Sequence, residues 1–147
     1  MRKLFYLSLI TIITGFLTIG CSSGGGDNGT PFIRDCWISG NEPDVKNGIN
    51  APLPYVFITG ATIWIGLLAY DSDGDIDSMT VSGNKSGGGS FGPSTASLSS
   101  SVSSSDVILY AILDLSGVAA GDWNFSVYVT DAKGNKSNTV MLAVKIN

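Results

Sequence analysis

The feature that most constrains this chain is a period-two alternation of apolar and other residues that recurs between turn sequences. In residues 122–130, DWNFSVYVT, the bulky apolar side chains occupy every second position. Residues 61–70, 106–115 and 139–147 alternate in the same way. Successive side chains of a strand point to opposite faces of a sheet, so this pattern is typical of β-strands. No segment carries a sustained helical period, and the chain is therefore predicted to fold as an all-β, antiparallel β-sandwich.

Two shorter apolar segments, 32–39 and 76–83, extend the series of predicted strands, and Asn47-Gly48 and Gly134-Asn135 mark turns between strands. A Gly- and Ser-rich stretch, 82–106, is the exception to the pattern. A long loop without structure is unusual inside a compact domain. We expect this stretch either to hold a weak edge strand around residues 96–102, where the chain crosses between sheets, or to form a mobile flap.

The first residues of the chain have the order of a secretory signal. Arg2 and Lys3 precede an apolar run, 4–19, which is followed by Gly20 and Cys21. A positive start, an apolar centre and a small residue before the cleavage point are typical of signal peptides. The run is shorter than the roughly 20 residues of a membrane-spanning helix, although an N-terminal anchor helix remains the alternative.

Residues 17–21, LTIGC, resemble the lipobox of bacterial lipoprotein signals, although Thr18 stands where that family prefers Leu. The resemblance implies that residues 1–20 are removed and that Cys21 is acylated on its thiol, for example with palmitate, and on its new amine. Several acyl chains make a stable anchor, since each buried CH₂ contributes about 0.8 kcal/mol. Ser22 stands where Asp would indicate retention in the inner membrane, so the resemblance implies the outer membrane if the cell is Gram-negative.

The remaining chain divides simply. Residues 21–31 are predicted to be a flexible Gly/Ser-rich linker, and residues 32–147 a single domain of ordinary size. If Cys21 carries lipid, Cys36 has no disulfide partner, and we expect it to be a small buried residue in a strand.

Composition excludes several classes of function. The chain of 147 residues contains no histidine, which excludes Ser-His-Asp and Cys-His catalysis and removes the commonest zinc ligand. Its net charge is −4, and removal of Arg2 and Lys3 with the signal would make it two units more negative. An acidic chain without a basic cluster argues against nucleic acid as a partner. We therefore predict no enzyme, no catalytic residues and no cofactor, with calcium as the only candidate ion.

Two segments carry a resemblance to bacterial immunoglobulin-like domains. LLAYDSDGDIDSMTVSG (67–83) resembles the strand–turn–strand that often reads apolar-Ala-x-Asp-x-Asp-Gly-Asp-Ile in that family. The segment 121–146 resembles the final hairpin, with Gly121 and Trp123 opening a strand and Asp-Ala-x-Gly-Asn-x-Ser at the turn. The resemblance implies an immunoglobulin-like sandwich of about seven strands over residues 32–147. Such sandwiches serve in adhesion, sugar binding and spacing, so the fold alone does not assign a function.

The stretch DSDGDID places four carboxylates at every second position: Asp71, Asp73, Asp75 and Asp77. Three of them fit positions 1, 3 and 5 of a hand-type calcium loop, but Ile76 stands where that loop needs Gly, and Ser82 stands where it needs Glu. We therefore favour a strand-to-strand turn that Asp71 caps, with Ile76 as the next core residue. Calcium remains the alternative, because a cation would relieve the repulsion among the carboxylates.

The second candidate site is an apolar face with aromatic rings. Trp64 and Tyr70 share one face of the strand 61–70, and Tyr110 would lie beside them if the strands 61–70 and 106–115 pair, as the immunoglobulin-like resemblance implies. Rings on a flat sheet can stack on sugar rings, and an exposed apolar patch marks an interaction surface. The alternative is that these side chains belong to the core or lie under the Ser/Gly loop.

These features together predict a lipid-anchored, extracytoplasmic domain of the bacterial cell envelope. The first hypothesis is an adhesion or carbohydrate-binding module, with a sugar or protein ligand at the aromatic face. The alternative is a structural partner within an envelope protein complex, without a small-molecule ligand.

Overall fold

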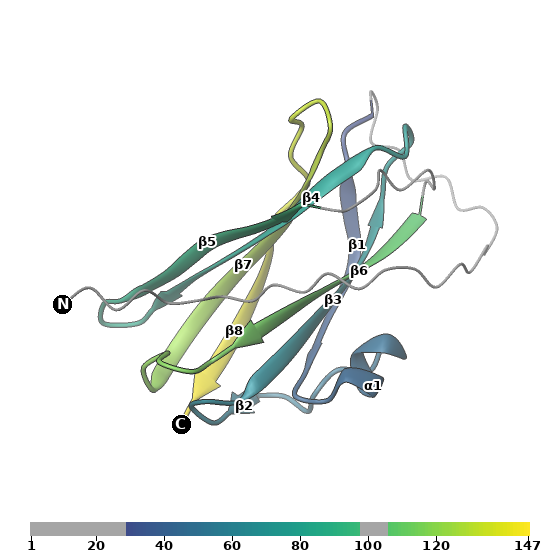
Figure 1. Cartoon of the computed structure of the whole chain (residues 1–147). Helices are drawn as coiled ribbons and strands as arrows, with labels where there is room; N and C mark the ends of the chain where they lie inside the picture. Colours follow the sequence, from purple (N-terminus) through teal and green to yellow (C-terminus); the bar gives the residue numbers. More distant parts are fainter. Residues whose placement is uncertain (1–28, 98–105) are drawn as a thin grey trace.

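The computed structural model describes residues 29–97 and 106–147. The expected signal sequence, Cys21 and most of the predicted linker lie outside the described residues. Within these ranges the chain forms eight strands and one short helix (Figure 1). They are β1 (Phe32–Ser39), α1 (Glu42–Lys46), β2 (Tyr55–Phe57), β3 (Thr62–Tyr70), β4 (Ile76–Lys85), β5 (Ser90–Ser97), β6 (Asp106–Asp114), β7 (Gly121–Asp131) and β8 (Val140–Ile146).

The strands form two sheets that pack against each other as an immunoglobulin-like β-sandwich (Figure 1). One sheet has three antiparallel strands in the order β1-β3-β6. The other has five strands in the order β2-β8-β7-β4-β5, antiparallel except for the parallel pair β2–β8. The predicted all-β, immunoglobulin-like sandwich is confirmed.

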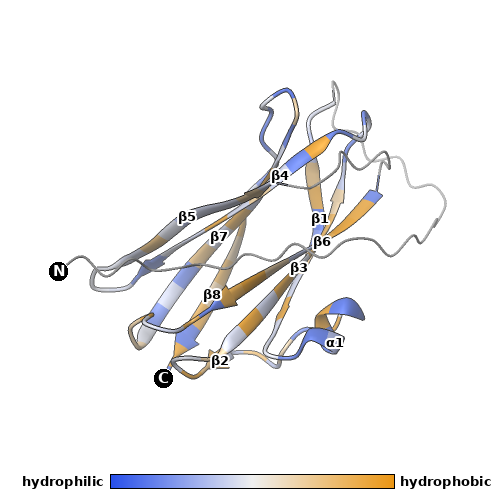
Figure 2. Ribbon diagram, in the orientation of Figure 1, coloured by the Kyte–Doolittle hydropathy of each residue, from blue (hydrophilic) through white to orange (hydrophobic). Residues whose placement is uncertain are grey.

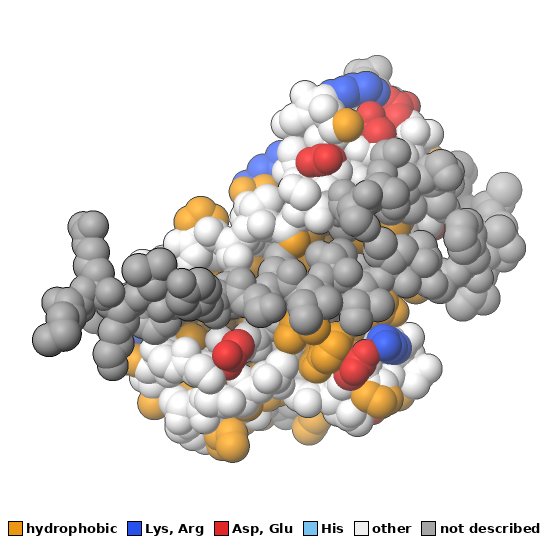
Figure 3. Space-filling view, in the orientation of Figure 1, with side chains coloured by type: hydrophobic (Ala, Val, Ile, Leu, Met, Phe, Trp, Pro, Cys, Tyr) orange, Lys and Arg blue, Asp and Glu red, His pale blue; other side chains and the backbone are white. Residues whose placement is uncertain are grey.

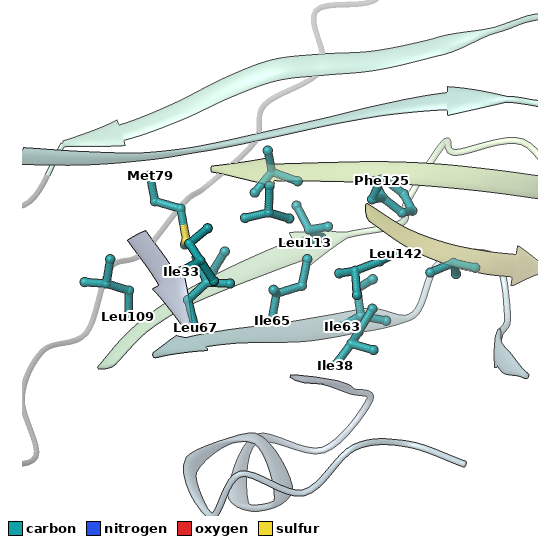
Figure 4. Close-up of a cluster of buried hydrophobic side chains, with 14 of the residues drawn as sticks. Ile33, Ile38, Ile63, Ile65, Leu67, Met79, Leu109, Leu113, Phe125 and Leu142 are labelled. Carbon is teal, nitrogen blue, oxygen red and sulfur yellow. The ribbon is translucent and has the colours of Figure 1, made fainter. Parts of the chain in front are cut away.

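The core lies between the two sheets and is built from the alternating residues of the sequence. Ile63, Ile65 and Leu67 of β3 face Phe125 and other apolar side chains of the five-stranded sheet (Figure 4). Strands β3 and β6 are hydrophobic along most of their lengths, whereas β7 alternates (Figure 2). A strand that alternates has one dry face, so β7 presents polar side chains to the solvent, whereas β3 and β6 carry apolar side chains on both faces.

The segment between β1 and β3 differs from its prediction as a series of turns, since it contains α1 and β2. Helix α1 is five residues long, too short to show a helical period in the sequence. Lys46 and Glu42 lie four residues apart and form an ion pair of 2.5 Å along the helix, and the Val45 side chain is buried. No helix among the described residues has the length and apolar character needed to cross a membrane.

Helix α1 is fixed to the outer face of the three-stranded sheet by Trp37. The Trp37 indole lies over Gly66 of the neighbouring strand β3, and its Nε1 donates a hydrogen bond to the Val45 carbonyl. The absence of a side chain at Gly66 is what allows the indole to lie flat against β3. The part of the outer face around Gly66 is therefore covered by Trp37 and α1.

The Gly/Ser-rich stretch contains more regular structure than the sequence indicates. Strand β4 extends to Lys85, and β5 pairs with it in antiparallel register at Ser90–Ser97, so the edge strand begins earlier than the predicted 96–102. Three glycines with positive φ, at positions 87–89, form the turn between them. Phe91 reaches the core and meets the Phe125 ring edge-on at 5.9 Å. Residues 98–105 lie outside the described part of the chain.

Candidate functional site

Strands β3 and β6 pair, as the immunoglobulin-like resemblance implies, and their register places Trp64 opposite Ile112 and Leu68 opposite Ile108. The side chains that face away from the core on these two strands are apolar and half-buried. We call this set the outer aromatic face: Trp64, Leu68, Tyr70, Ile108, Tyr110 and Ile112. All three predicted ligand residues, Trp64, Tyr70 and Tyr110, therefore lie on one surface outside the core.

Charged groups lie beside the outer aromatic face at one end and near its middle. At one end, Arg34 and Asp106 form a 2.8 Å ion pair, and the Arg34 guanidinium lies 4.3 Å from the centre of the Tyr70 ring. Helix α1 lies over the middle of the face, because its Val45 carbonyl accepts a hydrogen bond from the Trp37 indole above Gly66, and the view in Figure 3 has hydrophobic side chains over β3 beside charged side chains over α1. The outer aromatic face thus combines apolar rings with a charged border.

Tyr110 lies near the centre of the outer aromatic face, opposite Gly66. Burial raises the pKa of Tyr110, and the positive charge of Lys46 opposes this shift in part. The phenol therefore keeps its proton at neutral pH and can donate a hydrogen bond to a ligand.

Cys36 is half-buried on β1, and its side chain packs against the core. Burial raises the pKa of its thiol to about 12, and the negative charge of Asp35 contributes to the shift. A thiol with this pKa carries almost no thiolate at neutral pH and is a poor nucleophile. Cys36 is thus a small packing residue in a strand, as its sequence context indicates.

The second candidate site is an acidic cluster, which we define as Asp71, Asp75 and Asp131. Asp71 directly follows β3, Asp75 lies in the β3–β4 turn, and Asp131 ends β7. One carboxylate oxygen from each lies within 4.8 Å of the others. Asp71 and Asp131 are buried, and Asp75 is half-buried. The β3–β4 and β7–β8 connections meet at the same end of the sandwich (Figure 1).

Hydrogen bonds satisfy some oxygens of the acidic cluster and leave two without a partner. Asp71 Oδ1 accepts the Asp73 N–H at 3.1 Å, and Asp131 accepts the Lys133 N–H at 2.9 Å and two Asn135 donors at 2.7 Å. Asp71 Oδ2 and Asp75 Oδ1 are buried and have no hydrogen-bond partner. Burial raises the pKa of Asp71; the Asp73 N–H opposes the shift, and the Asp75 carboxylate reinforces it.

The structure separates the four acidic residues that the sequence groups together. Asp71 and Asp75 belong to the cluster, whereas Asp73 points outward and pairs with Lys133, and Asp77 is exposed on β4. The turn itself agrees with the sequence interpretation, because Asp71 caps it through the Asp73 N–H, and Ile76 is a core residue.

Asp131 is the member of the cluster that the sequence analysis did not predict. In the sequence it is only the first residue of the Asp-Ala-x-Gly-Asn turn. The pairing of β4 with β7 places Asp131 opposite Ile76, beside the acidic turn. The signal that could have indicated it is the occurrence of an acidic residue at the start of both turn motifs of the immunoglobulin-like pattern.

No family model and no curated protein matches this chain. Among solved structures, the fold is similar to a Niemann-Pick type C2 protein from Japanese carpenter ant, with 11% sequence identity and a TM-score of 0.52. That match covers 90% of this chain and 100% of the ant protein. A family 123 glycoside hydrolase from Clostridium perfringens aligns with 10% identity and a TM-score of 0.42. The match covers 80% of this chain and 27% of the hydrolase.

At these identities the similarities describe the fold. The similarity to the ant protein, which is matched over its whole length, agrees with the immunoglobulin-like sandwich that the sheet order defines. Fold similarity does not carry the chemistry of a site from one protein to another. The function must therefore be argued from the outer aromatic face and the acidic cluster.

Proposed function

We propose that this protein is a lipid-anchored binding module of the bacterial cell envelope, without enzymatic activity, whose outer aromatic face binds carbohydrate. The observation that supports this proposal is the row of half-buried apolar and aromatic side chains on the solvent side of β3 and β6. Polar side chains are usual on the solvent side of a sandwich, so a contiguous apolar surface there indicates an interaction site.

A sugar fits this surface better than a purely apolar ligand. A pyranose ring has an apolar C–H face that can stack on Trp64 or Tyr110, and its hydroxyl groups need hydrogen-bond partners at the edge. The Tyr110 phenol and the Arg34–Asp106 pair supply donors and acceptors at the surface. Aromatic side chains of this kind offer an apolar body and a polar tip, and a paired Arg and Asp add directional hydrogen bonds.

Replacing Trp64 by alanine is expected to weaken carbohydrate binding by at least about tenfold, because the stacking ring is lost. The side chain is only half-buried, so the free energy of unfolding should fall by no more than about 1–2 kcal/mol. Binding would be measured on a glycan array and then by calorimetry with the glycan that binds.

Met141→Ala is the matched control, since Met141 is a 60% exposed apolar residue on the other sheet and should bind as the wild type does. Equal binding by the Trp64→Ala variant would contradict the proposal. Co-purification with an envelope protein, in the absence of any glycan signal, would favour the structural role instead.

The membrane anchor of the proposal rests on the LTIGC sequence, which ends at Cys21. Cells that express the protein and receive labelled palmitate are expected to incorporate the label into it, and Cys21→Ala should abolish incorporation because the acylated thiol is missing. Cys36→Ala is the control, and this variant should keep the full label. A wild-type protein without label would show that the anchor is absent.

A further inference from the structure

The two unpartnered oxygens of the acidic cluster are unusual in a folded protein. Asp71 is 0% exposed, and its Oδ2 has neither a donor nor contact with solvent. Asp75 Oδ1 is also buried and unpartnered. Buried polar atoms almost always have a partner, and a buried carboxylate oxygen without one is strongly destabilising. Both atoms belong to residues of the cluster, and as ionised groups neither can donate a hydrogen bond to the other.

Lys133 is the nearest basic side chain, but its position does not satisfy these oxygens. Its ammonium group pairs with the exposed Asp73 and lies 3.6 Å from Asp75 Oδ2, the other oxygen of that carboxylate. Figure 3 shows acidic and basic side chains together on the surface at this end of the molecule. Lys133 therefore neutralises the exposed carboxylate of the turn at the surface. The buried Asp71 Oδ2 and Asp75 Oδ1 need another positively charged group as their partner.

We propose that Asp71, Asp75 and Asp131 bind a calcium ion where the β3–β4 turn meets the end of β7. This inference is independent of the proposed carbohydrate site. All three side chains supply hard oxygen ligands, which calcium prefers. Calcium binds oxygen at about 2.3–2.6 Å, so two ligands of one ion can lie up to about 5 Å apart, which agrees with a cluster contained within 4.8 Å. Magnesium demands near-ideal octahedral geometry and dehydrates reluctantly, so a site made of protein carboxylates favours calcium.

The ion would connect both sheets at one end of the sandwich. Asp71 continues from β3 of the three-stranded sheet, whereas Asp131 ends β7 of the five-stranded sheet. The Ala132 N–H already donates to the Asp75 carbonyl at 2.9 Å, so the two connections are in contact. A ligand that binds the folded state and not the unfolded one raises stability. Three ligands and no chelating Glu predict weak binding, in the range of about 10⁻⁴–10⁻³ M that extracellular modules show.

The test is the thermal unfolding of the whole chain in detergent, first with a chelator and then with about 10 mM calcium chloride. The melting temperature of the wild type is expected to rise by at least about 4 °C, the shift that binding at ten times the dissociation constant implies. Asp71→Asn should lose this rise, because it removes a buried charged ligand while its amide oxygen can still accept the Asp73 N–H. Asp75→Asn, at a half-buried site, is the second variant should Asp71→Asn fail to fold.

Asp77→Asn is the matched control. It removes the same charge from the same acidic stretch, but Asp77 is exposed and outside the cluster, so the rise in melting temperature should remain. Three results would overturn the proposal: no rise and no calorimetric heat for the wild type, an equal rise in the cluster variants, or an equal rise with magnesium. If the wild type shows neither a rise nor calorimetric heat, a proton shared by Asp71 and Asp75, and not a metal ion, neutralises their buried oxygens.

Discussion

Replacing Phe125 by alanine is expected to lower the free energy of unfolding by about 3–5 kcal/mol, a large part of the roughly 5–15 kcal/mol that holds a domain together. The Phe125 side chain is 0% exposed and stacks on the Trp123 ring at 5.9 Å. It also lies against Gly83, where a Cβ atom would be only 2.7 Å from the ring. Removing the ring would leave a cavity, and the closely packed side chains around it cannot readily move to fill it. Urea denaturation measures the loss.

Phe32→Ala is the matched control for Phe125→Ala, because it deletes the same atoms from a side chain that is 46% exposed at the start of β1. Its expected loss is below about 1 kcal/mol, since little packing disappears. Equal losses in the two variants would show that the ring of Phe125 is not at the centre of the core.

Replacing Gly66 by alanine is expected to destabilise the domain by about 2–4 kcal/mol, although the alteration adds a single methyl group. A Cβ at position 66 would overlap the Trp37 indole nitrogen and stand 2.6 Å from its Cε2. The indole must then move, which breaks its hydrogen bond to the Val45 carbonyl and releases α1 from β3. Overpacking costs about 1–3 kcal/mol, and the lost hydrogen bond adds about 1 kcal/mol.

Urea denaturation followed by tryptophan fluorescence would measure this effect, with a red shift expected as the Trp37 ring becomes solvated. Gly40→Ala is the control, since a Cβ there meets Phe57 only at 3.7 Å, an ordinary contact. If Gly66→Ala is as stable as Gly40→Ala, the absence of a Cβ atom at position 66 is not required for the packing of the Trp37 indole against β3.

Long alternating segments were predicted well, and short segments were not. The alternation in residues 61–70 and 106–115 predicts two strands, because a strand of nine residues repeats its two-sided pattern several times, whereas their pairing follows only from the immunoglobulin-like resemblance. Helix α1 and strand β2 were missed because five or three residues are too few for a period to appear. The sequence places strand β5 too late, since Ser and Gly carry little apolar signal and, of its residues, Phe91 packs against the core and Ala96 is buried.

The acidic site shows the same division more sharply. The sequence places Asp71 and Asp75 in one turn. That turn can be predicted because the Asp71 cap and the glycine both act within a few residues of each other. It could not exclude Asp73 and Asp77 from the site, because alternation along the chain does not reveal that Lys133 draws one carboxylate outward. Nor did it add Asp131, whose place depends on the long-range register of β4 against β7.

The sequence by itself determined which residues form the two faces of each long strand, and hence the sandwich and its core, because burial of apolar side chains follows the local period of two. Only the tertiary structure decided which distant residues meet. Strand register brings Asp131 to Asp71, and the bare backbone of Gly66 receives Trp37. These encounters depend on pairing between strands far apart in the chain, which no local pattern encodes.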